Sequence, residues 1–318
     1  MQNPFTDPPI NRKRVMAHHY QPYQGVIVPI VTPFQPDGSL DLDGLAKLVR
    51  HITGQGVGAL LLSGTTGEAV SLTEETRTGL LSHARNIAGD GITLYVGIGG
   101  NQFQQVVDRG NHLIEQGADA VVIHSPSYYP LGQENLRAWF EKTADALKGP
   151  VLIYNIPQTT HHSVDLDTLE TLSHHPNIYG VKDSEFDPTR LEEVIRHFHG
   201  RERFQVYIGP TVFASQAIRL GANGFIPSLG NVLPGVMQDI FEKAVAGDFQ
   251  GAEATQQKAT GLNDIYLKGQ PVGNAICDLK AILEVMGICR ACVSLPLLET
   301  PPERKEFLRK QALEFGLI

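Results

Sequence analysis

Eight short runs of β-branched and other apolar residues recur along this chain, and each is followed by a segment with helical patterning. Several of the runs are apolar without a break, as in residues 26–31, 59–62, 120–123 and 151–154. Continuous apolar runs of this length indicate strands that are buried on both faces, which is typical of a parallel sheet. The runs begin at Val26, Gly58, Ile92, Asp119, Pro150, Ile178, Phe204 and Gly224.

Eight strands that alternate with helices predict an α/β fold, a (β/α)8 TIM barrel, which typically takes roughly 250 residues. Helix signals lie between the runs: Thr73 begins one predicted helix and Gly117 ends another. An open doubly wound sheet is the alternative, but the first strand is not followed by the Gly-x-Gly-x-x-Gly turn of that fold.

The strand pattern stops near Leu233, and the remaining sequence predicts helices at residues 241–267, 275–286 and 304–315. We therefore predict three parts of the chain. They are an N-terminal arm at residues 1–24, a barrel at 25–232 and a C-terminal helical appendage at 233–318.

Charge and cysteine content narrow the class of protein. The chain has 318 residues and a net charge of −8, which does not favour nucleic acid or an anionic membrane as a partner. No apolar run approaches the ~20 residues of a membrane-spanning helix, and the polar N-terminus does not resemble a secretory signal. Three cysteines fit a reducing cytoplasm, and we expect Cys289 and Cys292 of the Cys-x-x-Cys sequence to be buried structural thiols.

Polar residues whose side chains could take part in a reaction lie where the predicted strands end. They follow the second, fourth, fifth and sixth strands, and so lie at the face where barrel enzymes place their active sites. Random placement would scatter them over both ends of the barrel. These residues are Thr65, Thr66, Tyr128, Tyr129, Tyr154 and Lys182.

Lys182 is the most informative of them, because a desolvated amine at the end of a buried strand is a nucleophile that can form an imine with a carbonyl. The turn at residues 64–67 offers backbone N–H groups and two hydroxyls to a carboxylate, and Tyr154 offers a phenol to move protons. Taken singly, each feature also has an ordinary explanation: a solvated lysine, a strand-to-helix turn and a packed tyrosine.

Four short motifs carry a more specific resemblance. They are VTPF at 31–34, GTTGE at 64–68, YNIP at 154–157 and GVKD at 180–183. In this order and spacing the chain, from about Gln24 to its end, resembles the dihydrodipicolinate synthase / N-acetylneuraminate lyase superfamily of class I, pyruvate-dependent aldolases.

The resemblance implies that Lys182 is the imine-forming lysine and that Tyr154 relays protons and orients the 2-keto acid. It implies that Thr65 links two tyrosines into the relay, while Thr66 and the turn that begins at Gly64 bind the substrate carboxylate. No cofactor is expected, because the imine itself serves as the electron sink.

By the same resemblance, Tyr128 reaches the relay of a neighbouring subunit in a homotetramer built from two dimers, with Tyr129 as the alternative. Ile226 matches the residue whose backbone carbonyl faces the bound pyruvyl group. These roles complete the predicted site for a small 2-keto acid.

Two departures from the family pattern bear on the substrate. Thr159 stands where dihydrodipicolinate synthases have an arginine that holds the carboxylate of aspartate semialdehyde, and threonine cannot form that bidentate pair. Residues 209–212 lack the acids that neuraminate lyases use to bind sugar hydroxyls. The sequence thus favours a lyase for a 2-keto-3-deoxy sugar acid or 4-hydroxy-2-oxoglutarate.

Several alternatives stay open. They are dihydrodipicolinate synthase proper, a non-catalytic keto-acid-binding protein on the same scaffold and an oxidoreductase on a doubly wound fold. His161 and His162 are candidates for a substrate contact or for solvated loop positions, and no metal site is expected because paired histidines on separate loops have no recognisable ligand spacing. The glycines at residues 97–101 are interpreted as a turn.

Overall fold

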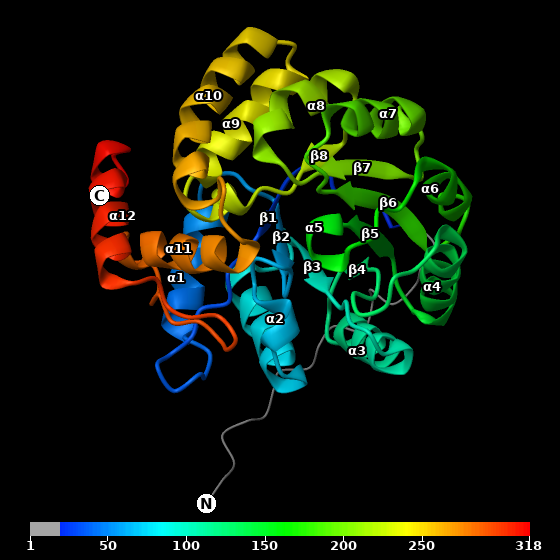
Figure 1. Cartoon of the computed structure of the whole chain (residues 1–318), viewed down its shortest axis with the longest axis horizontal. Coiled ribbons are helices and arrows are strands. Elements are labelled where there is room, and N and C mark those ends of the chain that lie inside the picture. The colour runs from blue at the N-terminus through cyan, green and yellow to red at the C-terminus, as the bar shows by residue number, and fades with distance from the viewer. Residues whose placement is uncertain (1–19) are drawn as a thin grey trace, which may run out of the picture.

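The computed structural model describes residues 20–318, and its core is a closed barrel of eight parallel strands (Figure 1). Each strand pairs with the next along the chain, and β8 returns to pair with β1. The predicted (β/α)8 barrel is confirmed. The strands are β1 Gly25–Pro29, β2 Ala59–Leu62, β3 Thr93–Gly97, β4 Ala120–His124, β5 Val151–Asn155, β6 Ile178–Asp183, β7 Gln205–Ile208 and β8 Gly224–Phe225.

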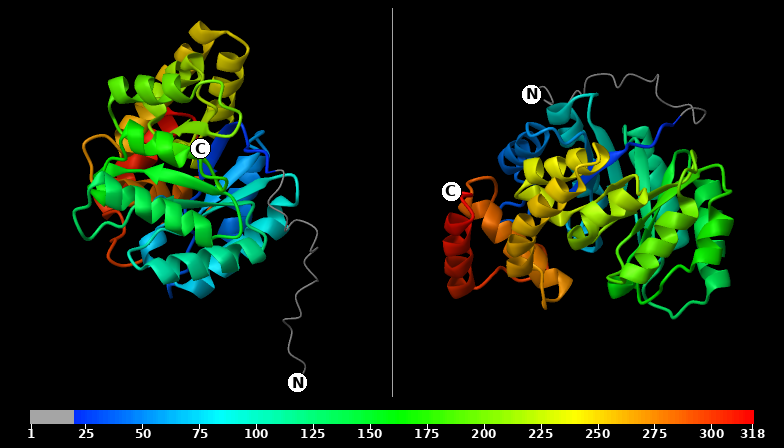
Figure 2. Two further views of the ribbon diagram at one scale, coloured as in Figure 1. Left: turned by 90° about the vertical axis from the view of Figure 1, so that its right-hand side faces the viewer. Right: turned by 90° about the horizontal axis from the view of Figure 1, so that it is seen from above.

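Helices surround the barrel, and the views in Figures 1 and 2 show them as an outer layer around the strands. Side-chain caps begin several of them: Asp41 accepts from the Gly44 N–H at α1, and Thr73 accepts from the Thr76 N–H at α2. The helices that follow the strands of the barrel are α1 Leu42–Thr53, α2 Glu74–Ala88, α3 Phe103–Glu115, α4 Gln133–Ala146, α5 Pro157–Thr160, α6 Leu166–Leu172, α7 Pro188–Phe198 and α8 Ala214–Leu220.

Closure of the barrel depends on a glycine where β8 meets β1. Gly25 is the register partner of Gly224, and a Cβ at Gly224 would lie 2.0 Å from the Gly25 carbonyl oxygen. No larger residue fits at that contact without moving the backbone.

Two separate apolar clusters follow from the alternation of side chains along each strand. The outer cluster lies between strands and helices and includes Val121, Ile123 and Ile153. The inner cluster fills the barrel and includes Val122 and Leu152. This alternation decides which residues at the strand ends face the centre of the barrel.

Tyrosines close the N-terminal end of the barrel. Tyr20 and Tyr23, which precede β1, pack against the inner cluster. The Tyr20 hydroxyl bonds to the Tyr95 hydroxyl at 3.0 Å, and the Gly58 N–H donates to the Tyr23 hydroxyl at 3.2 Å. Burial raises the pKa of Tyr95 and Tyr20, so these phenols stay neutral. The rest of the predicted arm, residues 1–19, lies outside the described residues.

Four helices follow the barrel, and α12 lies outermost, beside α11 (Figures 1 and 2). The predicted single helix at 241–267 is wrong. Gly247 has a φ of +85°, which ends α9, and the Asp248 side chain then caps α10 by accepting from the Gly251 N–H. The four are α9 Pro234–Val245, α10 Phe249–Tyr266, α11 Val272–Val285 and α12 Pro302–Glu314.

Candidate functional site

Lys182 lies near the C-terminal end of β6 with only 5% of its surface exposed. It is the register partner of Tyr154 on β5, and its Nζ lies 4.0 Å from the centroid of the Tyr154 ring. Within residues 20–318, Nζ has no hydrogen-bond or ion-pair partner. A buried lysine that is not engaged by a carboxylate is available to attack a carbonyl.

The turn at residues 64–67, called here the threonine turn, follows β2 and is stabilised by backbone hydrogen bonds. The N–H groups of Gly67 and Ala69 both donate to the Gly64 carbonyl, at 3.0 and 3.2 Å. Thr65 and Thr66 are partly buried at the tip of this turn. The sequence predicts one end of the barrel for four of the site residues. In the structure they do lie at or just after the C-terminal ends of β2, β5 and β6: Thr65, Thr66, Tyr154 and Lys182.

The other predicted site residues lie on three further loops. Ile226 is buried after β8, where its N–H donates to the Ile208 carbonyl at 2.8 Å. Thr159 lies in α5, and its hydroxyl donates to the Ile156 carbonyl at 3.3 Å. Tyr128 is 77% exposed and contacts the Tyr129 ring edge-on, with ring centroids 5.0 Å apart. The role of Tyr128 in a neighbouring subunit, and the homotetramer itself, stay predictions.

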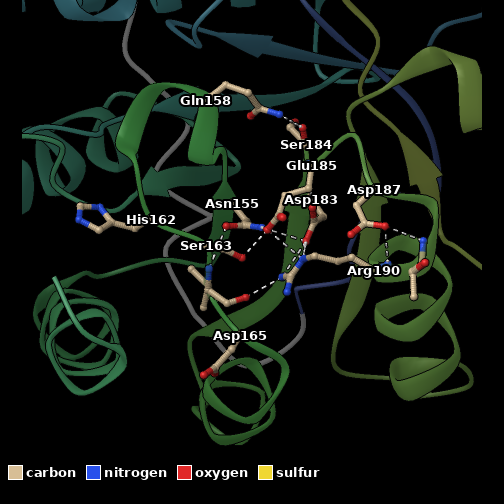
Figure 3. Close-up of polar contacts among 12 residues, drawn as sticks. Asn155, Gln158, His162, Ser163, Asp165, Asp183, Ser184, Glu185, Asp187 and Arg190 are labelled. Atoms are coloured by element: carbon tan, nitrogen blue, oxygen red, sulfur yellow. Dashed lines mark hydrogen bonds and ion pairs between the residues drawn. The ribbon is translucent and has the colours of Figure 1, made fainter. Parts of the chain in front are cut away.

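An ion-pair network that the sequence did not predict fastens the loops after β5 and β6 (Figure 3). Arg190, from the first turn of α7, contacts Asp183 at 2.9 Å and Glu185 at 3.0 Å. The Asn155 side-chain amide donates to the same two carboxylates, at 3.1 and 2.7 Å. Because Asp183 follows Lys182 and Asn155 follows Tyr154, this network fixes the backbone next to both site residues.

The surroundings of Asp183 act in opposite directions on the pKa of its carboxyl group. Burial raises the pKa of its carboxyl group, while the Arg190 guanidinium, a hydrogen bond from the Glu185 N–H and the Asn155 amide oppose that rise. Arg190 also donates to the Val164 carbonyl at 2.6 Å, which ties the β5 loop to α7. The arginine therefore compensates buried charge and joins two loops at once.

We expect Arg190→Leu to lower the free energy of unfolding by about 3 kcal/mol, because it leaves Asp183 and Glu185 without their cation in a buried setting. Arg196→Leu on the same helix is the control. Its ion pair with Glu192 is solvent-exposed, with 64% and 45% of the two side chains accessible, so its loss should cost at most about 0.5 kcal/mol. Urea denaturation of both variants measures the difference, and equal losses would show that the network does not stabilise the loops.

The loop histidines differ in their surroundings. His162 is buried, and its Nε2 accepts a hydrogen bond from the Leu131 N–H at 2.9 Å, away from the Arg190 network (Figure 3). His161 is exposed and has a φ of +63° at the end of α5. Position and bonding thus indicate that His162 anchors the loop after β4.

A second unpredicted ion pair lies behind the threonine turn. Glu68, which follows the turn, pairs with Lys280 of α11, and both side chains are fully buried. Lys280 also donates to the Cys292 carbonyl at 2.6 Å, and Glu68 accepts from the Ser294 N–H at 2.7 Å. Burial lowers the pKa of Lys280, whereas Glu68 acts against that shift. Helix α11 and the segment that follows it thereby hold the turn from outside the barrel.

Comparisons with known proteins identify the family. Residues 22–314 match the model of the dihydrodipicolinate synthetase family. A 4-hydroxy-tetrahydrodipicolinate synthase of Pseudomonas aeruginosa is 32% identical over 295 residues, covering 92% of this chain and 99% of the relative. One from Cytophaga hutchinsonii is 31% identical over 282 residues, covering 88% of this chain and 93% of the relative. The chain belongs to the dihydrodipicolinate synthetase family.

Solved structures of the dihydrodipicolinate synthetase family superpose closely. The dihydrodipicolinate synthase of Acinetobacter baumannii, solved with pyruvate, has a TM-score of 0.87 at 31% identity and covers 93% of this chain and 100% of its own. YagE, a prophage protein of the family from Escherichia coli K12 also solved with pyruvate, has a TM-score of 0.87 at 26% identity, covering 93% and 99%. As a member of this family, the chain is a class I aldolase or lyase.

Three further features of this family member complete the description. Among residues 20–318, no cluster of three or more histidine, cysteine or acidic side chains could hold a metal ion. No helix in the same range is long and apolar enough to cross a membrane. Cys289 is buried, whereas Cys292, predicted to be buried as well, is partly exposed.

Proposed function

We propose that this enzyme binds pyruvate as an imine on Lys182 and joins it to an aldehyde, or releases it in the reverse reaction. The observation that supports this most is the buried, unpaired Lys182 amine 4.0 Å from the centre of the Tyr154 ring. In this proposal the imine withdraws electrons from the adjacent carbon, Tyr154 moves protons, and the turn with Gly64, Thr65 and Thr66 binds the carboxylate. The Ile226 carbonyl faces the bound pyruvyl group.

Two acceptors compete within this proposal. The curated relatives are named 4-hydroxy-tetrahydrodipicolinate synthase, which supports condensation of pyruvate with aspartate semialdehyde. This reaction is one of the alternatives that the sequence left open. Thr159 supports the other candidate, cleavage of 4-hydroxy-2-oxoglutarate or a 2-keto-3-deoxy sugar acid, because its neutral hydroxyl already bonds to the Ile156 carbonyl and offers no cation to a carboxylate.

Borohydride reduction in the presence of pyruvate tests the shared first step. We expect a single reduced pyruvyl adduct, and peptide mapping should place it on Lys182. The folded protein must first be shown by mass to be free of bound keto acid. Absence of an adduct would overturn the proposal and leave the barrel as a binding scaffold. Aspartate semialdehyde, 4-hydroxy-2-oxoglutarate and 2-keto-3-deoxygluconate, assayed in parallel, then distinguish the acceptors by kcat/KM.

A further inference from the structure

Within residues 20–318, the segments that lead from each barrel strand to the next helix contain no lysine or arginine, and the strands contain one, Lys182. Barrel enzymes build their active sites from these segments. A substrate that approaches Lys182 therefore meets no cation that the segments themselves supply. The segments are residues 30–41, 63–73, 98–102, 125–132, 156–165, 184–187, 209–213 and 226–233.

Cations on the helices do not fill this gap. In the described part of the chain, those that bond to the strand-end segments are either paired with an acid or buried. They are Arg77, which is buried and donates to the Ala69 carbonyl, Arg109, paired with Glu74, Arg190, paired with Glu185, and Lys280, paired with Glu68. The segments carry acids instead, which are Asp37, Asp41, Glu68, Asp165, Glu185 and Asp187. A carboxylate at this face gains no ion pair and meets like charge.

Gln158 places an uncharged amide between the two strands of the site. It lies in α5, just after the strand that ends with Tyr154, and its Nε2 donates to the Ser184 carbonyl at 2.8 Å (Figure 3). This bond orients the amide. Its Oε1 has no hydrogen-bond partner within residues 20–318, and the side chain is exposed. An amide oxygen can accept from a hydroxyl group but cannot neutralise a carboxylate.

The anchor of this amide lies next to the site lysine. The Ser184 N–H donates to the Asn155 carbonyl at 3.0 Å, so the pairing of β5 with β6 continues one residue beyond β6. Side chains alternate along a strand, and Ser184 therefore faces the same side as Lys182, two residues before it. Its hydroxyl lies across Gly209, where a Cβ would come within 2.0 Å of it. The level above the amine is thus polar and uncharged.

We propose that the aldehyde partner of this enzyme is an uncharged hydroxyaldehyde and that the Gln158 amide binds one of its hydroxyl groups. This inference rests on the proposed imine at Lys182. In the synthetic direction the pyruvyl methyl group loses a proton, its carbon bonds to the aldehyde carbon, and the aldehyde oxygen gains a proton. Water then releases the 4-hydroxy-2-keto acid, and the lysine is restored without any other reagent.

The same charge distribution separates the candidate substrates. A 2-keto-3-deoxy sugar acid yields pyruvate and a neutral hydroxyaldehyde, which fits the uncharged surroundings of Gln158. Cleavage of 4-hydroxy-2-oxoglutarate yields glyoxylate, and aspartate semialdehyde also carries a carboxylate. Each of these two would need a cation that this face does not offer.

Three aldehydes that differ in charge and in hydroxyl groups test the proposal, each condensed with pyruvate on the full chain. Glyceraldehyde is neutral and hydroxylated, propanal is neutral without hydroxyls, and succinate semialdehyde carries a carboxylate. We expect kcat/KM for glyceraldehyde to exceed that for succinate semialdehyde at least about 10²-fold. Added salt should raise kcat/KM for succinate semialdehyde but not for glyceraldehyde, because screening weakens the repulsion between like charges.

Two variants in α5 assign the preference to residues. Gln158→Met keeps the length of the side chain and removes the amide, so kcat/KM should fall roughly 10-fold for glyceraldehyde and stay the same for propanal. Thr159→Arg supplies a cation and should raise kcat/KM for succinate semialdehyde at least about 10-fold. Gln55→Met is the control, since the Gln55 amide donates to the His51 carbonyl at 3.1 Å after α1, at the other end of the barrel. It should change none of the three values.

Borohydride trapping with pyruvate alone separates two kinds of failure. If the unaltered chain gives no adduct on Lys182, the proposed function itself fails. If the adduct forms but succinate semialdehyde reacts as well as glyceraldehyde, or none of the three aldehydes condenses, the preference for an uncharged hydroxyaldehyde is overturned. Equal losses for glyceraldehyde and propanal in Gln158→Met would overturn the role of Gln158, because an amide that only supports the loop affects both aldehydes alike.

Discussion

Lys182→Met is expected to abolish the borohydride-trapped pyruvyl adduct and to lower kcat/KM on the order of 10⁴-fold or more, as removal of a covalent nucleophile does. Methionine has a similar length and no amine. Because Lys182 Nζ has no hydrogen-bond or ion-pair partner within residues 20–318, the substitution leaves no other polar group unpaired. The free energy of unfolding should change by at most about 1 kcal/mol.

Tyr154→Phe is the matched control for this loss. It keeps Lys182 and the ring beside it but removes the phenolic hydroxyl. We expect the adduct to persist, while kcat falls roughly 10²-fold because the proton relay is impaired. Intact-mass measurement after reduction distinguishes the two variants directly. An adduct in Lys182→Met, mapped to another lysine, would contradict the assignment of the nucleophile.

The barrel was predictable because its signal is local. Each buried strand is a short apolar run, and the runs predicted to begin at Val26, Asp119 and Pro150 each start one residue from a strand start in the structure. The order of the runs also placed Tyr154 and Lys182 at the same end of the barrel, because parallel strands share a direction. That Tyr154 and Lys182 are register partners on adjacent strands could be seen only in the structure.

The supporting contacts were not predictable, because they join residues far apart in sequence. Glu68 and Lys280 are separated by 212 positions, and nothing in a helical pattern around Lys280 says that its amine is buried. Arg190 gave a weaker hint, since the Asp187-Pro188 signal places it in the first turn of a helix just after Lys182.

The C-terminal helices illustrate a different limit. The apolar pattern at 241–267 continues across the break at Gly247, because α9 and α10 pack against each other and both need an apolar face. Only the backbone conformation of Gly247 and the cap at Asp248 separate them. At this position the helix break at Gly247 and Asp248 decides the structure, although the apolar pattern continues across it.

Lys280→Met is the same substitution at another buried lysine. It should destabilise the fold strongly, whereas Lys182→Met should change the free energy of unfolding little. Lys280 is completely buried with Glu68, so methionine leaves a carboxylate without its cation and the Cys292 carbonyl without its donor. Breaking a buried pair in this way should lower the free energy of unfolding by about 4 kcal/mol. Denaturation at one fixed protein concentration, with Lys182→Met alongside, measures the contrast.

The double variant Lys280→Met with Glu68→Gln shows whether uncompensated charge is the cause. Glutamine keeps an oxygen that can accept from the Ser294 N–H but carries no charge. We expect the double variant to recover about 2 kcal/mol of the loss, because an uncharged pair avoids the desolvation of a lone carboxylate. If the double variant is no more stable than Lys280→Met, the lysine stabilises the turn through its contact with Phe34, whose ring centroid lies 4.5 Å from Nζ, and not through its pairing with Glu68.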